Sequence, residues 1–211
     1  LGDIAPEMQR WGTQIQYGRT NLNKKLVGTV PDFGDMRAHY PVAGGRFLNQ
    51  DDERLKRRVA FLGLGHMGGP MAINLVKAGY TVTGFDVVPA ALETARAHGI
   101  TTAETAGEAV AGAAVVLTML PSGKHLLDAY RGTPDQPGLL ATAAPGTLFL
   151  DCSTINVDEA REAAELAVAA GHRAVDAPVS GGVVGAEAGT LTFMVGALPE
   201  DFEAVRPMLE V

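Results

Sequence analysis

The chain has 211 residues, of which 46% are hydrophobic and 19% charged, which is enough apolar material for a buried core and too little charge for extensive disorder. Its 24 acidic residues outnumber its 17 lysines and arginines, and the net charge of -7 argues against broad binding to nucleic acid or to an anionic membrane. No uncharged apolar run is long enough to span a bilayer. The single cysteine, Cys152, can form no internal disulfide and lacks the partners of a metal site, so we expect a reducing, cytoplasmic setting.

The chain divides into two parts of different character. Residues 1–58 include 10 basic and 7 acidic residues, whereas residues 59–211 include 7 basic and 17 acidic residues. Prolines and glycines interrupt any periodic pattern in the first part, so we predict an irregular, unassigned N-terminal extension without a secretory signal or transit peptide. We predict that the second part is one domain. Because the chain begins with Leu1 and stops at Val211 without a terminal signal, we expect it to be cut at both ends.

From Val59 onward, short apolar runs alternate with Ala-rich helical stretches, which is the pattern of a parallel sheet covered by helices. Strands are predicted at residues 59–62, 80–85, 115–119, 147–150, 175–179 and 191–195. Helices are predicted at 67–79, 89–99, 156–170 and 199–209. Asn156 and Glu159 have the spacing of a capping box for the third of these helices. The predicted fold class is α/β, a doubly wound, Rossmann-like parallel sheet with helices on both faces.

A glycine-rich loop follows the first predicted strand and precedes the first predicted helix. Its residues are Gly63, Leu64, Gly65, His66, Met67 and Gly68, which fit the dinucleotide-binding fingerprint in the context that the fingerprint requires. Gly63 permits a tight turn, Gly65 lets a pyrophosphate approach the backbone, and Gly68 lets the helix pack close to the strand. The N-terminus of the helix then receives the phosphates. The alternative is a glycine-rich turn that occurs by chance.

Asp86 follows the second predicted strand, 21 residues beyond Gly65. A carboxylate at about this offset accepts hydrogen bonds from the ribose hydroxyls and repels a 2′-phosphate. The position therefore favours NAD over NADP. His66 allows two interpretations, because a histidine in this loop either donates to a phosphate or points to solvent.

Small hydroxyl and glycine residues recur just after three later strands, where ligands collect in open α/β sheets. These segments are Leu120-Pro121-Ser122, Asp151-Cys152-Ser153-Thr154 and Ser180-Gly181-Gly182. Their hydroxyls and backbone N–H groups suit a carboxylate or a nicotinamide ring, but the same residues are ordinary turn formers, and both interpretations stay open.

Two acidic residues and the cysteine at these strand ends have structural interpretations. Asp151 and Asp176 each terminate a predicted strand, and we predict that they order the following loop by accepting backbone N–H bonds rather than acting as acid or base. Cys152 is interpreted as a small buried residue and not as a nucleophile, because no histidine adjoins it in the sequence.

Four motifs, taken in order, resemble those of the β-hydroxyacid dehydrogenase family. They are the stretch Phe61 to Met71 around the glycine loop, Met119-Leu120-Pro121, Asp151 to Ile155, and Asp176 to Gly182 with its continuation to Gly196. Residues 59–211 thus resemble the N-terminal, NAD-binding domain of that family. We expect the all-helical domain that follows in the family to be absent from this chain.

The resemblance implies roles for individual residues. It implies that Leu120 and Pro121 line the nicotinamide side of the cofactor and that Thr154 contacts the cofactor. His125 stands where the family often has an asparagine that contacts the cofactor. The full implied cofactor-binding set is Gly63, Leu64, Gly65, His66, Met67, Gly68, Asp86, Leu120, Pro121, His125 and Thr154. The residues implied to hold the substrate carboxylate are Ser180, Gly181 and Gly182.

The resemblance also implies the reaction, which is oxidation of 3-hydroxyisobutyrate to methylmalonate semialdehyde with hydride passing to NAD, a step of valine catabolism. The family's general acid/base is a lysine on a helix beyond Val211, so we expect no catalytic residue in this chain and no activity from it alone. The alternatives are a related tartronate semialdehyde or sulfolactaldehyde reductase, or a non-catalytic dinucleotide-binding module. The expected partners are a small 3-hydroxy acid and, with the helical domain present, further copies of the chain; nucleic acid and membrane are not expected.

Overall fold

The computed structural model describes residues 8–10, 14–17, 20–23, 26–28, 58–134 and 136–211. The chain divides into two units, Leu1–Arg54 and Leu55–Val211. The first unit contains two antiparallel pairs of short strands, β1 (Met8–Arg10) with β4 (Leu26–Gly28) and β2 (Gln14–Tyr17) with β3 (Thr20–Asn23).

These four strands differ from the irregular extension that we predicted for residues 1–58. Strands of three or four residues are too short for an alternating pattern to stand out from the surrounding polar sequence. The signal was nevertheless present in β2, where polar and apolar residues alternate and Ile15 pairs with Leu22 of β3. The predicted domain boundary after residue 58 stays a prediction.

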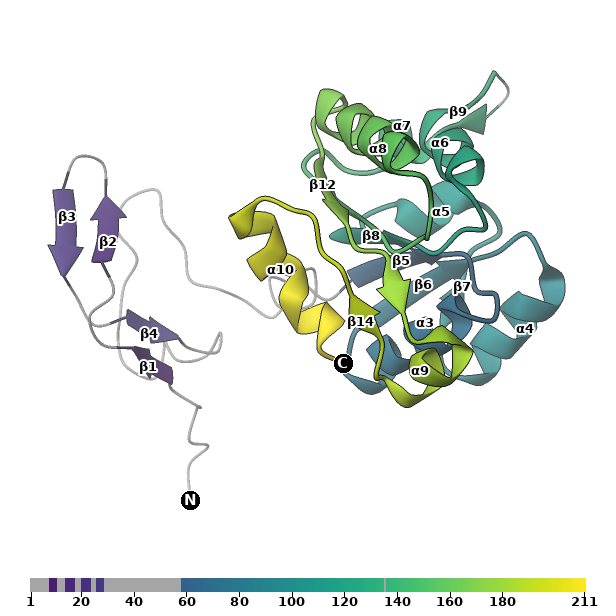
Figure 1. The fold of residues 1–211 in the computed structure, drawn as a ribbon, viewed down its shortest axis with the longest axis horizontal. Coiled ribbons are helices and arrows are strands. Elements are labelled where there is room, and N and C mark those ends of the chain that lie inside the picture. Colours follow the sequence, from purple (N-terminus) through teal and green to yellow (C-terminus); the bar gives the residue numbers. More distant parts are fainter. Residues whose placement is uncertain (1–7, 11–13, 18–19, 24–25, 29–57, 135) are drawn as a thin grey trace. The chain divides into compact units, whose positions relative to one another are not determined.

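Six parallel strands form the main sheet of the second unit. In spatial order they are β12 (Arg173–Asp176), β11 (Leu148–Asp151), β8 (Val115–Thr118), β5 (Arg58–Leu62), β6 (Thr81–Phe85) and β7 (Thr101–Thr102). Counted along the chain from β5, and starting from β7, this is the order 3-2-1-4-5-6 of the doubly wound Rossmann fold. The predicted fold class is confirmed (Figure 1).

Helices cover both faces of this sheet (Figure 1). One face carries α3 (Gly68–Lys77), α4 (Pro89–Ala97), α9 (Gly182–Ala188) and α10 (Pro199–Leu209). The other carries α5 (Ala106–Val110), α6 (Gly123–Arg131), α7 (Leu139–Thr142) and α8 (Val157–Ala169). Helices α3, α4, α8 and α10 confirm the predicted ones, whereas α5, α6, α7 and α9 were not predicted. Alternating side chains of β5 supply both faces, since Val59 and Phe61 join one cluster and Ala60 and Leu62 the other.

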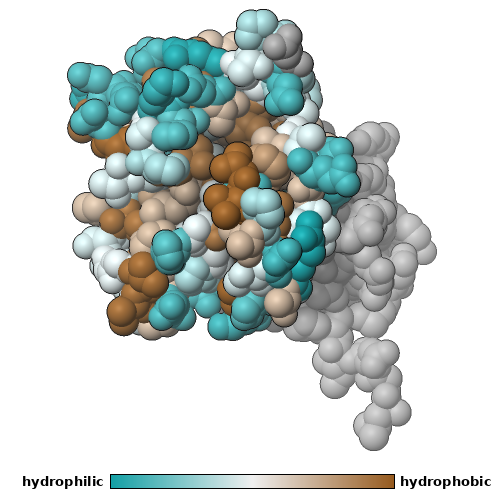
Figure 2. Space-filling model, turned by 90° about the vertical axis from the view of Figure 1, so that its right-hand side faces the viewer, coloured by the Kyte–Doolittle hydropathy of each residue, from teal (hydrophilic) through white to brown (hydrophobic). Residues whose placement is uncertain are grey.

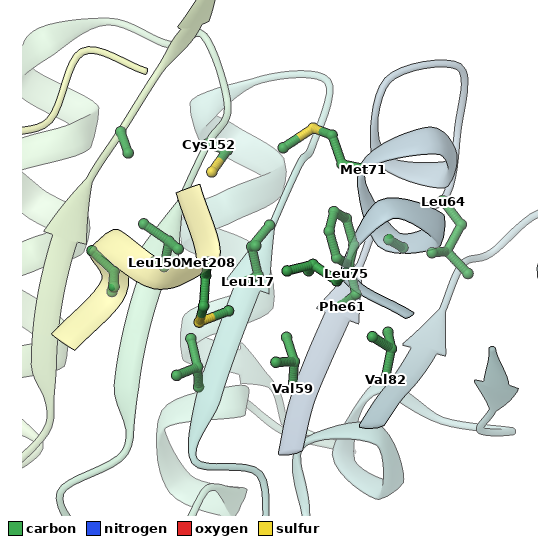
Figure 3. Packing of buried hydrophobic residues seen from close by; sticks show 14 of the residues in the cluster. Val59, Phe61, Leu64, Met71, Leu75, Val82, Leu117, Leu150, Cys152 and Met208 are labelled. Carbon is green, nitrogen blue, oxygen red and sulfur yellow. The ribbon is translucent and has the colours of Figure 1, made fainter. Parts of the chain in front are cut away.

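The larger hydrophobic cluster lies between the sheet and α3 (Figure 3). Phe61 of β5 is fully buried, and Leu117 of the neighbouring β8 is nearly so. Met71 and Leu75 of α3 and Met208 of α10 cover these strands (Figure 3). Burying a side chain of this size stabilises the fold by about 1.5–3 kcal/mol. The strand that precedes the glycine loop is therefore firmly held in the core.

The strand predicted at residues 175–179 exists, but its predicted bounds were wrong. Strand β12 ends at Asp176, and Val179–Ser180 forms a separate strand, β13, that pairs antiparallel with β14 (Thr192–Phe193). Pro178 lies between the two strands and has no backbone N–H to continue the ladder. Strand β14 is also shorter than the predicted 191–195. A further short antiparallel pair joins β9 (Gly132–Thr133) and β10 (Gln136–Pro137).

The capping box predicted for α8 was also wrong, although the helix begins where expected. Asn156 stands at the N-cap, but its side chain makes no hydrogen bond to the described backbone of α8. Its Nδ2 atom instead donates to Oε2 of Glu159 at 3.2 Å. A hydrogen bond to a carboxylate is stronger than one between neutral groups, which accounts for the exchange.

The surface of the second unit is mixed in character. On the face shown in Figure 2, apolar residues occur in separate groups among hydrophilic ones. Exposed apolar side chains include those of Val87, Val184 and Leu198. Among the helices within the described residues, none is long and apolar enough to cross a bilayer.

Candidate dinucleotide-binding site

The glycine loop leaves β5 where the strand order of the sheet reverses. Strand β5 lies between β6 and β8, and in open α/β sheets ligands bind in the crevice at this point. The N–H of Gly63 donates to the carbonyl of Phe85 at 3.0 Å, at the end of β6. The N–H of Met119 donates to the carbonyl of Leu62 at 2.9 Å, just beyond β8. Backbone bonds to both neighbouring strand ends thus fix the start of the loop.

The three glycines of the fingerprint meet different local requirements. Gly63 has a φ of 91°, and a Cβ atom there would lie 2.2 Å from the Met119 carbonyl oxygen. A Cβ atom on Gly68 would lie 1.9 Å from the Gly63 carbonyl oxygen. At Gly65, no atom of the described residues other than its own and its two chain neighbours' lies within 4 Å of the Cβ position. This open space beside the backbone is where a pyrophosphate would approach, so the loop fits a dinucleotide.

The Asp86 carboxylate is bonded to the glycine loop. Its Oδ2 atom accepts the N–H of Leu64 at 2.6 Å, and its Oδ1 atom accepts the N–H of Val88 at 2.8 Å. Asp86 is half-buried. Since each carboxylate oxygen has a second acceptor site, the group can hold the loop and still accept bonds from ribose hydroxyls. The bond to the loop was not predicted from the sequence.

A groove of about 810 Å³ runs along the loop, within the range of ligand pockets. Four predicted residues line it, namely Leu64, Gly65, His66 and Asp86. Ile73 of α3 and Ala91 of α4 are among its apolar walls. No acidic residue stands in the first turn of α3, all of which the structure describes, so that N-terminus suits an anionic group.

The other predicted cofactor residues lie outside this groove. The side chain of Met67 packs partly against the larger core cluster. Gly63 and Gly68 lie where the backbone of the loop packs closely against Met119 and against itself. Pro121 and Thr154 are exposed after β8 and β11. His125 is exposed on α6, where its Nδ1 atom lies 2.7 Å from Oγ of Ser122.

The predicted substrate-binding residues connect β13 to α9. Ser180 is exposed at the end of β13. Gly181, at the N-cap of α9, has a φ of 135°, and Gly182, the first residue of α9, has a φ of 64°. Both conformations favour glycine. The sequence predicted this turn but not the helix directly after it.

A buried polar cluster lies behind the segment that follows β8. Oδ1 of Asp151 accepts the hydroxyl of Thr118 at 2.6 Å and the hydroxyl of Ser153 at 2.7 Å. Oδ1 also accepts the N–H of Ser153 at 3.3 Å, which confirms the loop-ordering role predicted for Asp151. Burial raises the pKa of Asp151 to about 6, although these hydrogen bonds oppose the shift. Ser153, which the sequence did not place in the cofactor-binding set, also accepts the N–H of Leu120 at 2.8 Å.

Cys152, the neighbour of Asp151, is fully buried and free. Burial raises the pKa of its thiol, and the nearby Asp151 and Asp176 carboxylates raise it further. A buried thiol of this kind is a poor nucleophile. The interpretation of Cys152 as a small buried residue is confirmed.

The fold and the glycine loop together define a dinucleotide-binding domain of the doubly wound class. Residues 58–211 match the family described as the NAD binding domain of 6-phosphogluconate dehydrogenase. The chain belongs to this family and carries the NAD-binding domain of the β-hydroxyacid dehydrogenases. The predicted cofactor, NAD, is confirmed at the level of the family.

Named relatives are dehydrogenases. The chain is 51% identical over 154 residues to an NAD-dependent L-serine dehydrogenase of Pseudomonas aeruginosa. The matched region is 73% of this chain and 51% of that protein. The chain is also 51% identical over 152 residues to a 3-hydroxyisobutyrate dehydrogenase of the same organism, and this matched region is 72% of this chain and 50% of that protein. A structure of Mycobacterium tuberculosis 3-hydroxyisobutyrate dehydrogenase with L-serine matches with a TM-score of 0.68 and 52% identity, over 72% of this chain and 50% of that one. The chain spans about half the length of the relatives that it matches.

Proposed function

We propose that this chain supplies the cofactor-binding part of an NAD-dependent dehydrogenase that oxidises 3-hydroxyisobutyrate to methylmalonate semialdehyde. Residues 59–211 form the NAD-binding domain in this proposal, and residues 1–58 precede it as an extension. The observation that carries the proposal is the pairing of Asp86 with the glycine loop beside a groove in which Gly65 leaves the backbone accessible.

Each proposed binding residue has a distinct task. The backbone at Gly65 and the N-terminus of α3 hold the pyrophosphate, and Asp86 accepts bonds from the ribose hydroxyls. The hydroxyl of Ser180 and the backbone N–H groups of Gly181 and Gly182 hold the substrate carboxylate by charge-assisted hydrogen bonds. When bound, NAD accepts a hydride from the carbon that carries the substrate hydroxyl. The hydroxyl proton passes to a base that we place outside residues 58–211.

The remaining predicted contacts belong to the nicotinamide half of the cofactor. Leu120 and Pro121 follow β8 directly beside the glycine loop, since Gly63 abuts the Met119 carbonyl. Thr154 and His125 lie exposed after β11 and on α6, where a ligand can reach them. We propose that these four residues contact the nicotinamide half, with His66 exposed in the groove at the pyrophosphate half.

A preference for NAD over NADP is part of the proposal. The Asp86 carboxylate would repel a 2′-phosphate on the ribose that it binds. Fluorescence titration of the chain with NADH and NADPH tests this preference, and tighter binding of NADH is expected. Equal affinities, or tighter binding of NADPH, would contradict the role proposed for Asp86 in the preference for NAD.

L-serine is a second candidate substrate. The two Pseudomonas aeruginosa relatives named for serine and for 3-hydroxyisobutyrate are equally identical to this chain, at 51%. Both compounds carry a carboxylate and a primary alcohol, and they differ in an ammonium or a methyl group at the second carbon. The polar turn at Ser180 would hold their common carboxylate equally well, so it does not separate them.

Steady-state kinetics of the full-length protein would decide between the substrates. 3-Hydroxyisobutyrate, L-serine, glycerate and 3-hydroxypropionate are compared by kcat/KM with NAD, and the highest value is expected for 3-hydroxyisobutyrate. A higher value for L-serine would select the second candidate, and a higher value for glycerate would indicate a tartronate semialdehyde reductase. Binding of NADH without turnover of any substrate would indicate a non-catalytic module. A homo-oligomer and a cytoplasmic location complete the proposal.

A further inference from the structure

We propose that Asp151 and Ser153 are positioning residues that hold the backbone at Leu120 against the nicotinamide half of the cofactor. The inference rests on the proposed function, because it takes the segment after β8 to face the nicotinamide. Neither residue was placed in the cofactor-binding set from the sequence. Both act through the backbone of another segment and not by touching the cofactor.

A directed chain of hydrogen bonds links the three residues. The N–H of Leu120 donates to Oγ of Ser153 at 2.8 Å, so the hydroxyl oxygen is an acceptor there. The hydroxyl hydrogen of Ser153 is then directed to Oδ1 of Asp151, at 2.7 Å. An ionised Asp151 can only accept hydrogen bonds, and this fixes the hydroxyl in the orientation that accepts from Leu120.

The far end of the chain is anchored in the sheet. Asp151 pairs with Thr118 across β11 and β8, and the Thr118 hydroxyl donates to the same Oδ1 atom at 2.6 Å. Thr118 and Ser153 are fully buried, and Asp151 is 5% exposed. Hydrogen bonds between groups so shielded from water are strong and hold a single geometry. The chain therefore ties a surface segment to a rigid point in the core.

The tied segment also touches the glycine loop. The Met119 carbonyl lies against Gly63, where a Cβ atom would come within 2.2 Å of its oxygen, and the Met119 N–H donates to Leu62. A shift at Leu120 would therefore act on the segment after β8, while the bonds of Gly63 to Phe85 and of Leu64 to Asp86 still hold the glycine loop. In the part of the chain that the structure describes, no comparable hydrogen bonds link Asp151 to Asp86, whose bonds run to Leu64 and Val88. The adenosine half of the groove is thus held independently.

The second oxygen of Asp151 provides a route for regulation by pH. Among the residues that the structure describes, Oδ2 has no hydrogen-bond partner, and Asp151 lines a cavity of about 20 Å³, which is room for one water molecule. The titratable groups that act on Asp151 or respond to its charge are Tyr130 of α6, Cys152 and Asp176 of β12. Each is neutral or anionic, so none stabilises the Asp151 charge, and burial raises the pKa of Asp151 to about 6. A protonated Asp151 is a weaker acceptor for Ser153, so the hold on Leu120 loosens in acid.

The test compares NAD with ADP-ribose, which lacks the nicotinamide, by isothermal titration calorimetry on the whole chain. For Ser153→Ala at pH 7.5, we expect NAD to bind about fivefold more weakly, as for a lost buried hydrogen bond, with the affinity for ADP-ribose unchanged. In the unmutated chain, the ratio of the NAD and ADP-ribose dissociation constants should rise as the pH falls from 7.5 to 5.

Two further variants make the result specific. Asp151→Asn keeps an acceptor oxygen for Ser153 but cannot titrate, so its ratio should change less between pH 5 and pH 7.5 than that of the unmutated chain. Thr147→Val removes another buried hydroxyl, one that donates to the Ala144 carbonyl just before β11, at the opposite end of that strand. It should lower the unfolding midpoint without changing the ratio.

The outcomes separate this inference from the proposed function. If the unmutated chain binds neither NAD nor ADP-ribose, the proposed function fails. If it binds both, and Ser153→Ala leaves the ratio unchanged, or Asp151→Asn keeps the pH dependence of the unmutated chain, the positioning role is overturned while the proposed function stands. A ratio that changes equally in Thr147→Val would assign the effect to general loss of stability and would also overturn the positioning role.

Discussion

The Oδ2 atom of Asp86 lies 2.6 Å from the backbone nitrogen of Leu64, so the carboxylate that follows β6 holds the loop that follows β5. The same side chain thus supports the backbone that we propose binds the pyrophosphate and is available to the ribose. A substitution at this position removes a bond within the protein as well as the proposed bonds to the cofactor, and its effect must be judged on both.

Asp86→Ser is expected to weaken NADH binding about tenfold or more, because a short hydroxyl can replace neither the loop bond nor both ribose bonds. NADPH binding should fall less, since the repulsion of its 2′-phosphate is relieved. Fluorescence titration with the two reduced cofactors measures both changes. Glu93→Ser removes an exposed acid of α4 that does not line the groove and should leave both affinities unaltered. An unchanged ratio of affinities in Asp86→Ser would contradict the assignment.

Gly65→Ala and Gly68→Ala should separate binding from folding. A methyl group at Gly65 meets no described atom within 4 Å beyond its two chain neighbours but would occupy the space proposed for the pyrophosphate, so the variant should fold normally and bind NADH at least tenfold more weakly. A methyl group at Gly68 meets a backbone carbonyl at 1.9 Å and should lower the unfolding midpoint. Thermal denaturation and NADH titration of both variants provide the comparison. Equal destabilisation by the two changes would be inconsistent with these local environments.

The fold was predictable where one residue pattern dominates a segment. Strand β5, the glycine loop and α3 follow from a short apolar run, the fingerprint spacing and apolar residues at helical spacing. The bounds of the strand predicted at 175–179 were wrong because β-branched residues lie on both sides of Pro178, and pattern alone does not show where a chain changes sheets. Helix α6 was missed because charged and polar residues such as Lys124 and Asp128 conceal a buried face of Leu126, Leu127 and Tyr130.

Arg173→Ala is expected to reduce stability by about 1–3 kcal/mol, because it leaves a buried acceptor unpaired. Nε of Arg173 donates to Oδ1 of Asp201 at 2.5 Å, and Asp201 is 4% exposed in the first turn of α10. Lys124→Ala breaks an exposed ion pair with Asp128 and should cause no measurable change. Urea denaturation of both variants measures the difference. Similar stabilities for the two variants would show that the Arg173 contact is no stronger than an exposed one.

The stability of the chain should depend on the ionisation of Asp151. Its folded-state pKa of about 6 lies above the value of about 3.9 expected for an unfolded chain, so the folded state binds the proton more tightly. The resulting stabilisation is full below pH 4 and is lost as the pH rises through 6. Between pH 4 and pH 7.5 it amounts to about 2 kcal/mol.

Asp151→Asn removes this term, so the free energy of unfolding of the variant minus that of the unmutated chain should increase with pH. Urea denaturation at pH 4, 5.5 and 7.5 measures the difference, in which the titration of the other carboxylates cancels. A difference that is constant over this range would show that Asp151 does not titrate as its burial requires.

The candidate site was predictable from residues that act through their own backbone or charge, such as Gly65 and Asp86. Ser153 was missed because its function depends on a hydrogen bond to Leu120, 33 positions earlier in the chain, and no spacing rule connects the two. The only signal was a hydroxyl two residues after a strand-terminal acid. Such a pattern is typical of turns, and only the packing of β8 beside β11 shows what it binds.

The position of β5 between β6 and β8 has a consequence for the order of folding. Leu62 and Val115, at the end of β5 and the start of β8, are separated by more than fifty residues, yet Gly63 abuts the segment after β8. A nascent chain that has formed only β5, α3 and β6 therefore possesses the fingerprint without one wall of its binding surface. Because distant strand pairings form slowly, binding of NAD should report completion of the central sheet and should be absent from early intermediates.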